Sequence, residues 1–246
     1  MDSKFKPRAV IFDLGSTLIE YESDSWETLS ILCAASVNKF LVKRGYATPG
    51  DEEFFQLFEE VKKDFRESAS KSLVEWTIPQ AASKLLEKLE IEPGDGFIED
   101  LFEAYYKPVA ARIYAYDDAV RILERIKARV GTIGLISNTI FPEDTHRGEL
   151  KKFGLAPFLD FTIFSSSFGL RKPHPDIFYK AANLAGCAPA ECVYIGDRYV
   201  EDYRGPTEMG MKAILKLWPR REYPGDMPAD IPTITSLTDL GNYLDI

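Results

Sequence analysis

Five short apolar runs, rich in Val, Ile and Phe, recur along the chain and limit the folds open to it. Runs without alternating polar residues are typical of strands whose two faces are both buried in a parallel sheet. Amphipathic helical patterns separate the last four runs. This order predicts an α/β fold, a doubly wound and mainly parallel sheet with right-handed crossovers. The expected strands cover 8–13, 132–137, 161–165, 192–196 and 212–217, and the helices between them cover about 145–153, 174–185 and 200–210.

The gap between the first two runs, about 20–115, contains only helical periodicity, in four apolar stripes. Four helices without strands can form a small bundle with a core of its own. We therefore expect two domains, an α/β core of residues 1–19 and 116–246 and an inserted all-helical domain of residues 20–115. The first stripe begins at Asp24 and joins Trp26, Leu29, Cys33, Val37 and Phe40.

Composition narrows the classes of partner. The 246 residues carry a net charge of −9 without a long Lys/Arg cluster, so we expect no nucleic-acid partner. No apolar segment approaches the roughly 18 residues of a transmembrane helix, and the N-terminus lacks the apolar core of a signal peptide. We therefore expect a cytoplasmic protein without membrane association. The 3 cysteines form no CxxC pair, and 2 histidines leave little room for a zinc site.

Polar side chains follow four of the expected strands. Because the carboxyl ends of parallel strands meet at one edge of the sheet, where open α/β sheets bind ligands, these side chains are expected to converge. For the strand expected over 161–165, the polar residue is Lys172, in the loop that follows the strand. In chain order the residues are Asp13, Ser137, Asn138, Lys172, Asp197 and Asp202.

The chemistry of these residues favours a metal-assisted reaction on a phosphoryl group. Asp13, Asp197 and Asp202 cannot lie together without a cation, and an all-oxygen cluster suits Mg²⁺ better than zinc or copper. Lys172, Ser137 and the backbone of the Gly-Ser-Thr turn behind Asp13 are donors suited to phosphoryl oxygens. Asp13 is a plausible nucleophile, because aspartyl phosphates are known covalent intermediates. The alternative is that each Asp only caps a helix or a turn.

Together these segments resemble the four motifs of the haloacid dehalogenase (HAD) superfamily. VIFDLGSTL resembles the first motif, LISNT the second, GLRKPHPDIF the third, and YIGDRYVED with GPTEMGM the fourth. The resemblance covers the whole chain and implies a HAD-like, Rossmann-like core with a hydrolase activity that uses Mg²⁺. The helical insertion is similar to the C1 cap domain of that superfamily.

The resemblance also implies roles for individual residues. Asp13 would be the nucleophile, and Lys172 would act beside it. The implied phosphate-binding residues are Ser137, Asn138, Lys172, Ser16 and Thr17. The implied metal ligands are Asp13, Asp197, Asp202 and, through its backbone carbonyl, Gly15, with Glu201 as a possible further support.

Gly15 departs from the pattern of the superfamily's phosphatases. These usually carry Asp-x-Asp-x-Thr, and the second Asp, here Gly15, protonates the leaving group. Losing a general acid costs typically about 10²–10⁴-fold in rate, so the sequence predicts a weakened phosphatase that acts best on acyl or aryl phosphates. Glu20, Glu22, His146 and His174 could replace the acid, although solvated linker charge is the commoner role of such glutamates.

Three functions stay open at this stage. The first is a Mg²⁺-dependent phosphohydrolase that acts on a small phosphorylated metabolite through an aspartyl phosphate on Asp13. The second is a dehalogenase- or phosphonatase-like hydrolase, since both lack the second Asp. The third is a nearly inactive HAD-fold protein that binds a phosphorylated ligand or a protein partner. Phosphonatase chemistry needs a cap lysine, and the candidates are Lys62, Lys63, Lys71, Lys84 and Lys88.

Two expectations concern the surface. Aromatic residues of the helical domain could bury a face against a second subunit, which would make the protein a homodimer. The proline-rich segment 218–232 is expected to be a long surface loop with a solvated Arg220–Arg221 pair. The aromatic residues are Phe54, Phe55, Tyr105 and Tyr106.

Overall fold

The computed structural model describes residues 4–22 and 25–246. The chain forms two compact units, one of Met1–Glu20 with Ala115–Ile246 and one of Tyr21–Tyr114. The domain boundaries expected from the sequence lie within one residue of these.

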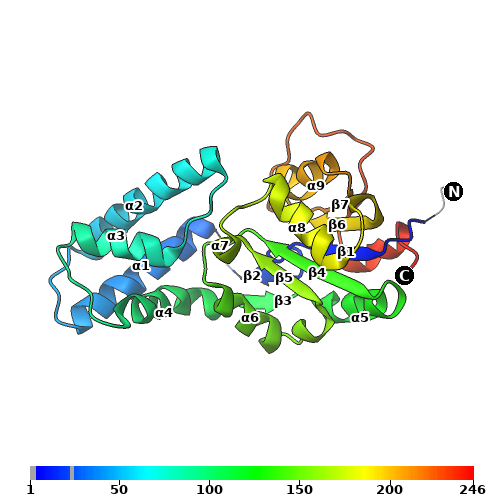
Figure 1. Cartoon of the computed structure of the whole chain (residues 1–246). Helices are drawn as coiled ribbons and strands as arrows, with labels where there is room; N and C mark the ends of the chain where they lie inside the picture. Colours follow the sequence, from blue (N-terminus) through cyan, green and yellow to red (C-terminus); the bar gives the residue numbers. More distant parts are fainter. Residues whose placement is uncertain (1–3, 23–24) are drawn as a thin grey trace. The chain divides into compact units, whose positions relative to one another are not determined.

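The first unit contains a six-stranded parallel sheet, in the order β5-β4-β1-β6-β7-β8. The chain passes from β1 outward through β4 to β5, then returns to the other side of β1 and continues through β6 and β7 to β8 (Figure 1). The order therefore reverses at β1, where such sheets open a ligand crevice at their carboxyl edge. The strands are β1 (Ala9–Phe12), β4 (Thr132–Ser137), β5 (Phe161–Phe164), β6 (Cys192–Gly196), β7 (Lys212–Lys216) and β8 (Thr233–Ile234).

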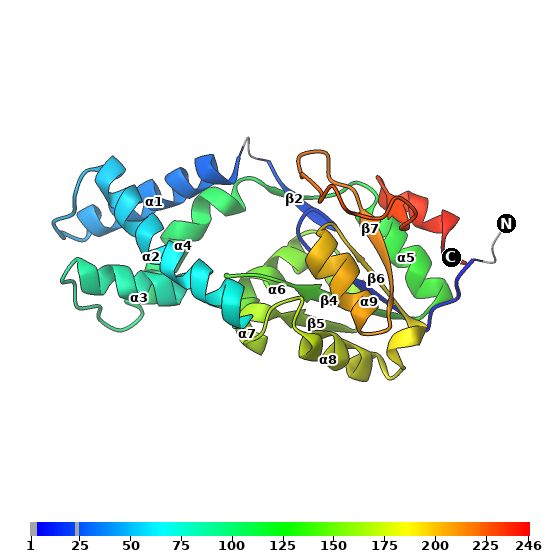
Figure 2. The same cartoon turned by 90° about the horizontal axis from the view of Figure 1, so that it is seen from above.

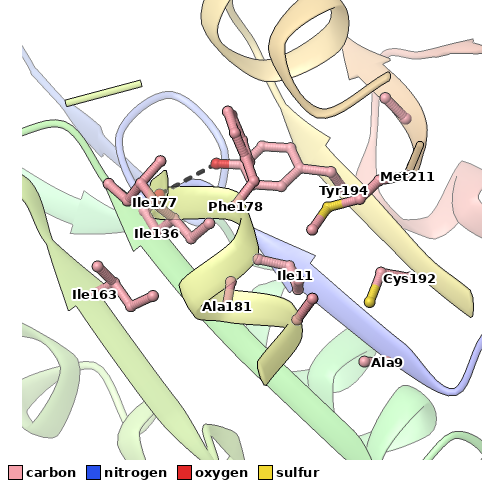
Figure 3. Packing of buried hydrophobic residues seen from close by; sticks show 12 residues of the cluster. Ala9, Ile11, Ile136, Ile163, Ile177, Phe178, Ala181, Cys192, Tyr194 and Met211 are labelled. Atoms are coloured by element: carbon pink, nitrogen blue, oxygen red, sulfur yellow. Dashed lines mark hydrogen bonds between the residues drawn. The ribbon is translucent and has the colours of Figure 1, made fainter. Parts of the chain in front are cut away.

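Helices cover both faces of this sheet, which confirms the α/β class. In Figure 1, α5 (Ala119–Arg129) and α6 (Glu143–Lys152) lie on one face, and α8 (Pro175–Ala185) and α9 (Gly205–Glu208) lie on the other. The buried face of α8 packs its Ile177, Phe178 and Ala181 over Ile11 and Tyr194 of the sheet (Figure 3). The shorter elements are α7 (Ser165–Phe168), the 3₁₀ turns Ala156–Phe158, Pro189–Glu191 and Leu237–Asn242, and a π-helical turn, Tyr199–Arg204.

The helix expected over 200–210 is present, but its hydrogen-bond pattern changes along its length. A π-helical turn ends at Arg204, and α9 begins at Gly205. Pro206 has no N–H to continue the hydrogen-bond pattern of the preceding turn. Gly205 also lies so close to Pro173 and to Phe178 of α8 that an added Cβ would come within 2.9 Å and 3.1 Å of them. Close packing at Gly205 and one missing donor at Pro206 therefore mark the change from π-helical to α-helical geometry.

The second unit contains four helices. In Figure 2, α2 and α3 run beside α1 and α4, and α1 packs along α4. An edge-to-face contact between Phe58 and Tyr105, with centroids 5.8 Å apart, lies in its core. The helices are α1 (Trp26–Lys43), α2 (Asp51–Ser72), α3 (Ile78–Lys88) and α4 (Phe97–Ala110), and the strands β2 (Ile19–Tyr21) and β3 (Ile113–Ala115) pair with each other.

Two details of the first apolar stripe differ from expectation. Trp26 is 54% exposed, so it lies outside the core that the rest of the stripe forms. Ser25 caps α1 by accepting a hydrogen bond from the Thr28 backbone N–H, whereas Asp24, the expected start, lies outside the described residues. Within the described residues, no helix combines the length and apolarity that crossing a membrane requires.

Candidate active site

The carboxyl edge of the sheet brings three acidic residues together. Asp13 follows β1 and Asp197 follows β6, its neighbour in the sheet, and the Asp13 backbone N–H donates to the Ile195 carbonyl at 2.8 Å. Asp202 lies in the π-helical turn after β6 and is fully buried. One carboxylate oxygen from each of the three lies within 4.8 Å of the other two. Residues far apart in the sequence thus share one site.

Lys172 reaches the same site from the loop after α7. Its ammonium donates to Asp13 Oδ1 at 2.7 Å and to Asp202 Oδ1 at 2.6 Å. It also contacts the Tyr194 hydroxyl at 2.7 Å and the Ile136 carbonyl at 3.2 Å, and the hydroxyl donates to that carbonyl at 3.3 Å (dashed line in Figure 3). Burial acts to lower the pKa of Lys172, but the Asp13 and Asp202 carboxylates outweigh it and hold this pKa well above its usual value. A permanent positive charge therefore faces Asp13.

The acidic cluster still carries excess negative charge. Burial first, and then the charges of Asp13 and Asp202, raise the pKa of Asp197 to about 7. Three buried carboxylates without His or Cys form a hard-oxygen donor set that matches Mg²⁺. The residues present therefore fit a divalent cation, because it would relieve their repulsion. Glu201 lies outside this group, and its carboxylate is 3.8 Å from Arg198.

The proline-rich loop supplies a second positive charge at the site. Arg221 Nη2 lies 2.5 Å from Asp197 Oδ2, and the Arg221 side chain is only 21% exposed. The prediction that Arg221 is solvated is therefore wrong, whereas Arg220 is exposed as expected. The Tyr223 hydroxyl holds the loop in place: it donates to the Asp197 carbonyl at 3.1 Å and accepts from the Trp218 N–H at 2.8 Å.

The turn behind Asp13 contains the residues expected to bind phosphate. Ser16 adopts a positive φ of 58°, and its carbonyl accepts a hydrogen bond from the buried Lys216 ammonium at 2.8 Å. The Thr17 backbone N–H donates to the Leu14 carbonyl at 3.3 Å. Thr17 Oγ1 is buried and has no hydrogen-bond partner among the described residues. An unsatisfied buried hydroxyl is costly, which favours a ligand oxygen beside it.

The second expected phosphate-binding segment follows β4. Ser137 is the last residue of the strand and is 5% exposed. Asn138 binds the backbone of Lys172 with both ends of its amide: Nδ2 donates to the Lys172 carbonyl at 2.9 Å, and Oδ1 accepts from the Lys172 N–H at 2.7 Å. This arrangement favours a role for Asn138 in placing Lys172.

The candidate replacement acids from the linker differ in burial. Gly15 itself offers no side chain, and its backbone pairs with Ile19 in an isolated bridge. Glu20 is not a solvated linker charge, because it is 6% exposed and its Oε2 accepts a hydrogen bond from the Tyr116 hydroxyl at 2.8 Å. Glu22 is exposed and belongs to the helical unit.

The two histidines also have structural partners. His146 is 2% exposed, with Nε2 2.6 Å from Thr139 Oγ1 and Nδ1 2.6 Å from Glu149 Oε2. Both of its ring nitrogens are therefore occupied. His174 precedes α8 as its N-cap residue, and its Nδ1 accepts a hydrogen bond from the Asp176 backbone N–H at 3.2 Å. Neither arrangement leaves a histidine poised to protonate a leaving group.

Sequence reasoning missed Tyr194 and Lys216. A tyrosine in an otherwise aliphatic strand is a usable signal, because a buried hydroxyl needs a hydrogen-bond partner. A lysine at the carboxyl end of an apolar strand is a similar signal, since a buried ammonium must find an acceptor. Arg221 offered no such signal, because it lies in a polar loop.

Comparison with known proteins identifies relatives of the chain. A family model described as haloacid dehalogenase-like hydrolase matches residues 7–210. The glyceraldehyde 3-phosphate phosphatase of Methanopyrus kandleri is 26% identical, over 84% of this chain and 82% of its own length. The phosphoglycolate phosphatase of Xylella fastidiosa is 26% identical, over 88% of this chain and 83% of its own length.

Solved structures share the fold. A 2-haloacid dehalogenase from Pseudomonas syringae superimposes with a TM-score of 0.71 at 21% identity, covering 96% of each chain. At this identity the likeness concerns the fold alone. The family match spans most of the sequence, including all the strand ends described above except the last two. The chain therefore belongs to the haloacid dehalogenase-like hydrolase family and is an enzyme.

Proposed function

We propose that the protein is a Mg²⁺-dependent phosphohydrolase that acts on a small phosphorylated metabolite through an aspartyl phosphate on Asp13. The observation that carries this proposal is the Lys172 ammonium 2.7 Å from Asp13, beside a cluster of three buried aspartates. Relatives named phosphatases of glyceraldehyde 3-phosphate and of phosphoglycolate support a small phosphorylated metabolite as the class of substrate.

The geometry supports a covalent route in two steps. In the first, an oxygen of Asp13 forms a bond to phosphorus while the bond from phosphorus to the leaving oxygen breaks. In the second, water attacks the phosphorus of the aspartyl phosphate, which releases inorganic phosphate and regenerates the Asp13 carboxylate. Lys172 offsets the charge on Asp13 and on the phosphoryl oxygens throughout, because its ammonium stays protonated.

The metal and the phosphate would be held by residues on either side of Asp13. Bound Mg²⁺ would neutralise part of the charge of the phosphoryl group. Asp13, Asp197, Asp202 and the Gly15 carbonyl would hold it. Ser137, Ser16 and Thr17 would donate to the phosphoryl oxygens, and the unpartnered Thr17 hydroxyl supports this assignment.

The leaving group must take its proton from outside the first motif. Gly15 carries no acid, and the Glu20 carboxylate is engaged with Tyr116. We therefore propose that the enzyme favours phosphates whose leaving groups need little protonation, such as acyl and aryl phosphates. The cost of the missing acid is about 10²–10⁴-fold for poor leaving groups.

The alternative hydrolases receive less support. Dehalogenation needs no metal, so the acidic cluster would be unexplained. For a phosphonatase, Lys62 is buried in the helical unit, where its ammonium contacts Glu59 and lies over the Phe58 and Tyr105 rings. Activity assays distinguish the proposed enzyme from a nearly inactive protein that binds a phosphorylated ligand or a protein partner.

The test uses purified protein with acetyl phosphate and p-nitrophenyl phosphate. We expect turnover with Mg²⁺ that is lost on chelation and in Asp13→Asn. Gly15→Asp should accelerate alkyl phosphates more than aryl phosphates, because only the former need the added acid. Turnover that survives chelation would exclude the metal-dependent route, and no turnover in any condition would favour the binding protein.

A homodimer through the helical unit stays a prediction. Of the four aromatic residues expected at such a face, Phe54 and Tyr105 are buried within the unit itself. Only Phe55 and Tyr106 are partly exposed. Sedimentation of the purified protein measures the assembly directly.

A further inference from the structure

A buried polar network lies behind the second motif and takes no part in the route above. It consists of Thr139, His146 and Glu149, which are 8%, 2% and 5% exposed. The His146 ring stacks on Phe164 with centroids 5.3 Å apart and tilts against Phe141 at 5.8 Å. Three buried polar side chains among aromatic rings are costly unless each is satisfied. The burial of these three side chains therefore needs an explanation.

Hydrogen bonds connect the three side chains in one chain. Thr139 Oγ1 accepts from the Phe141 backbone N–H at 3.0 Å and lies 2.6 Å from His146 Nε2. His146 Nδ1 lies 2.6 Å from Glu149 Oε2 and donates to this carboxylate oxygen, which can only accept. Both polar atoms of the His146 ring therefore have partners, and Glu149 orients the ring.

The backbone of Thr139 is fixed as firmly as its side chain. Its N–H donates to Ser165 Oγ at 2.8 Å, and the Ser165 hydroxyl donates to the Thr139 carbonyl at 3.3 Å. Ser165 is fully buried and is the first residue of α7, directly after β5. Thr139 is therefore held from α6 through its side chain and from the start of α7 through its backbone.

The network leads directly to the reacting groups. Thr139 follows Asn138, whose amide grips the backbone of Lys172 at 2.9 Å and 2.7 Å. Lys172 in turn contacts Asp13 at 2.7 Å. A shift of Thr139 must therefore move Asn138 and, with it, the ammonium that faces Asp13.

We infer that Thr139, His146 and Glu149 are positioning residues, which hold the loop after β4 so that Asn138 sets the place of Lys172. The inference rests on the proposed function for its effect on turnover. His146 acts through Thr139 and does not touch the substrate, because it is buried and both ring nitrogens are occupied.

The test compares Thr139→Val with Thr139→Ser and with a control at the other end of β4. Val keeps the shape but removes the hydroxyl, so Phe141 N–H and His146 Nε2 lose their partner, whereas Ser restores it. The control is Asp160→Asn, because Asp160 Oδ2 accepts from the Ile133 N–H at 2.8 Å and its carboxylate pairs with Lys127. Both changes weaken an anchor of the same strand.

We expect Thr139→Val to lower kcat/KM for p-nitrophenyl phosphate by about 10- to 100-fold, since small misplacements of reacting groups have such effects. Inorganic phosphate should also bind more weakly by calorimetry, and the NMR signals of the Asn138 side-chain amide should move. Thr139→Ser should keep kcat/KM, phosphate binding and the Asn138 amide signals close to those of the wild type. Asp160→Asn should lower the thermal stability but change none of these three measurements. Equal effects in Thr139→Val and Asp160→Asn would overturn the inference.

Two other outcomes are also decisive. If the wild type neither binds nor hydrolyses phosphates, the proposed function is wrong, and the NMR signals of the Asn138 side-chain amide alone test the inference. If Thr139→Val does not fold, Glu149→Gln replaces it and should move the same signals to a smaller extent, because an acceptor for Nδ1–H remains. Unmoved Asn138 signals in a folded variant would overturn the inference in either case.

Discussion

Replacing Lys172 by Met tests whether this lysine is the counter-ion that makes the acidic cluster tolerable. Lys172 is 2% exposed and contacts two carboxylates, Asp13 at 2.7 Å and Asp202 at 2.6 Å. Met matches the length of the side chain and fills the same space. Removing one partner of a buried ion pair leaves an uncompensated buried charge, which costs about 3–5 kcal/mol. That is a large share of a typical total of about 5–15 kcal/mol.

The assay is urea unfolding of the metal-free protein near neutral pH, followed by circular dichroism. Lys62→Met is the control, because Lys62 is equally buried but pairs with Glu59, whose side chain is 25% exposed and can be hydrated. We expect a smaller loss there, and Mg²⁺ should stabilise Lys62→Met no more than it stabilises the wild type, because the proposed metal ligands are unchanged. Mg²⁺ at about a hundredfold excess over its Kd should return roughly 2.7 kcal/mol to Lys172→Met. A metal-free loss below about 1 kcal/mol would refute the counter-ion role.

Three further predictions concern the metal, the loop and the sheet. The pKa of Asp197 in the metal-free protein is about 7, above its ordinary value, so ionising Asp197 opposes folding and its contribution to stability should fall as the pH rises toward 7. Because Mg²⁺ needs the ionised carboxylate, the Mg²⁺ affinity measured by calorimetry should weaken by up to about tenfold per pH unit below 7. An affinity independent of pH would contradict this prediction. Arg221→Ala should tighten Mg²⁺ binding, because it removes a positive charge 2.5 Å from Asp197, whereas Arg220→Ala should leave Mg²⁺ binding unchanged. Equal affinities in the two variants would show that Arg221 does not compete with Mg²⁺ for Asp197. Gly134→Ala should destabilise the protein by about 1–3 kcal/mol in urea unfolding, because the new Cβ would lie 2.1 Å from the Phe161 ring, and unchanged stability would show that the ring moves away freely.

The class of fold and the ends of the strands were predictable from local sequence. Apolar runs at 132–137 and 192–196 coincide with β4 and β6 because strands buried on both faces need unbroken apolar stretches. Asp13 and Asp197 were predictable as neighbours because parallel strands present their carboxyl ends at one edge. The helix expected over 200–210 is present, but its π-helical first part was not predicted, because apolar periodicity indicates a helix and not its hydrogen-bond pattern.

The sequence by itself determined which chemistry could gather at the edge of the sheet: carboxylates, a lysine and hydroxyls, each placed by its own strand. Tertiary structure alone decided their partners. It placed Arg221 on Asp197 and Lys216 on the Ser16 carbonyl. The reason is physical: periodicity reports which face of an element is buried, whereas a buried polar group is satisfied by whatever atom the packed chain brings within hydrogen-bond distance.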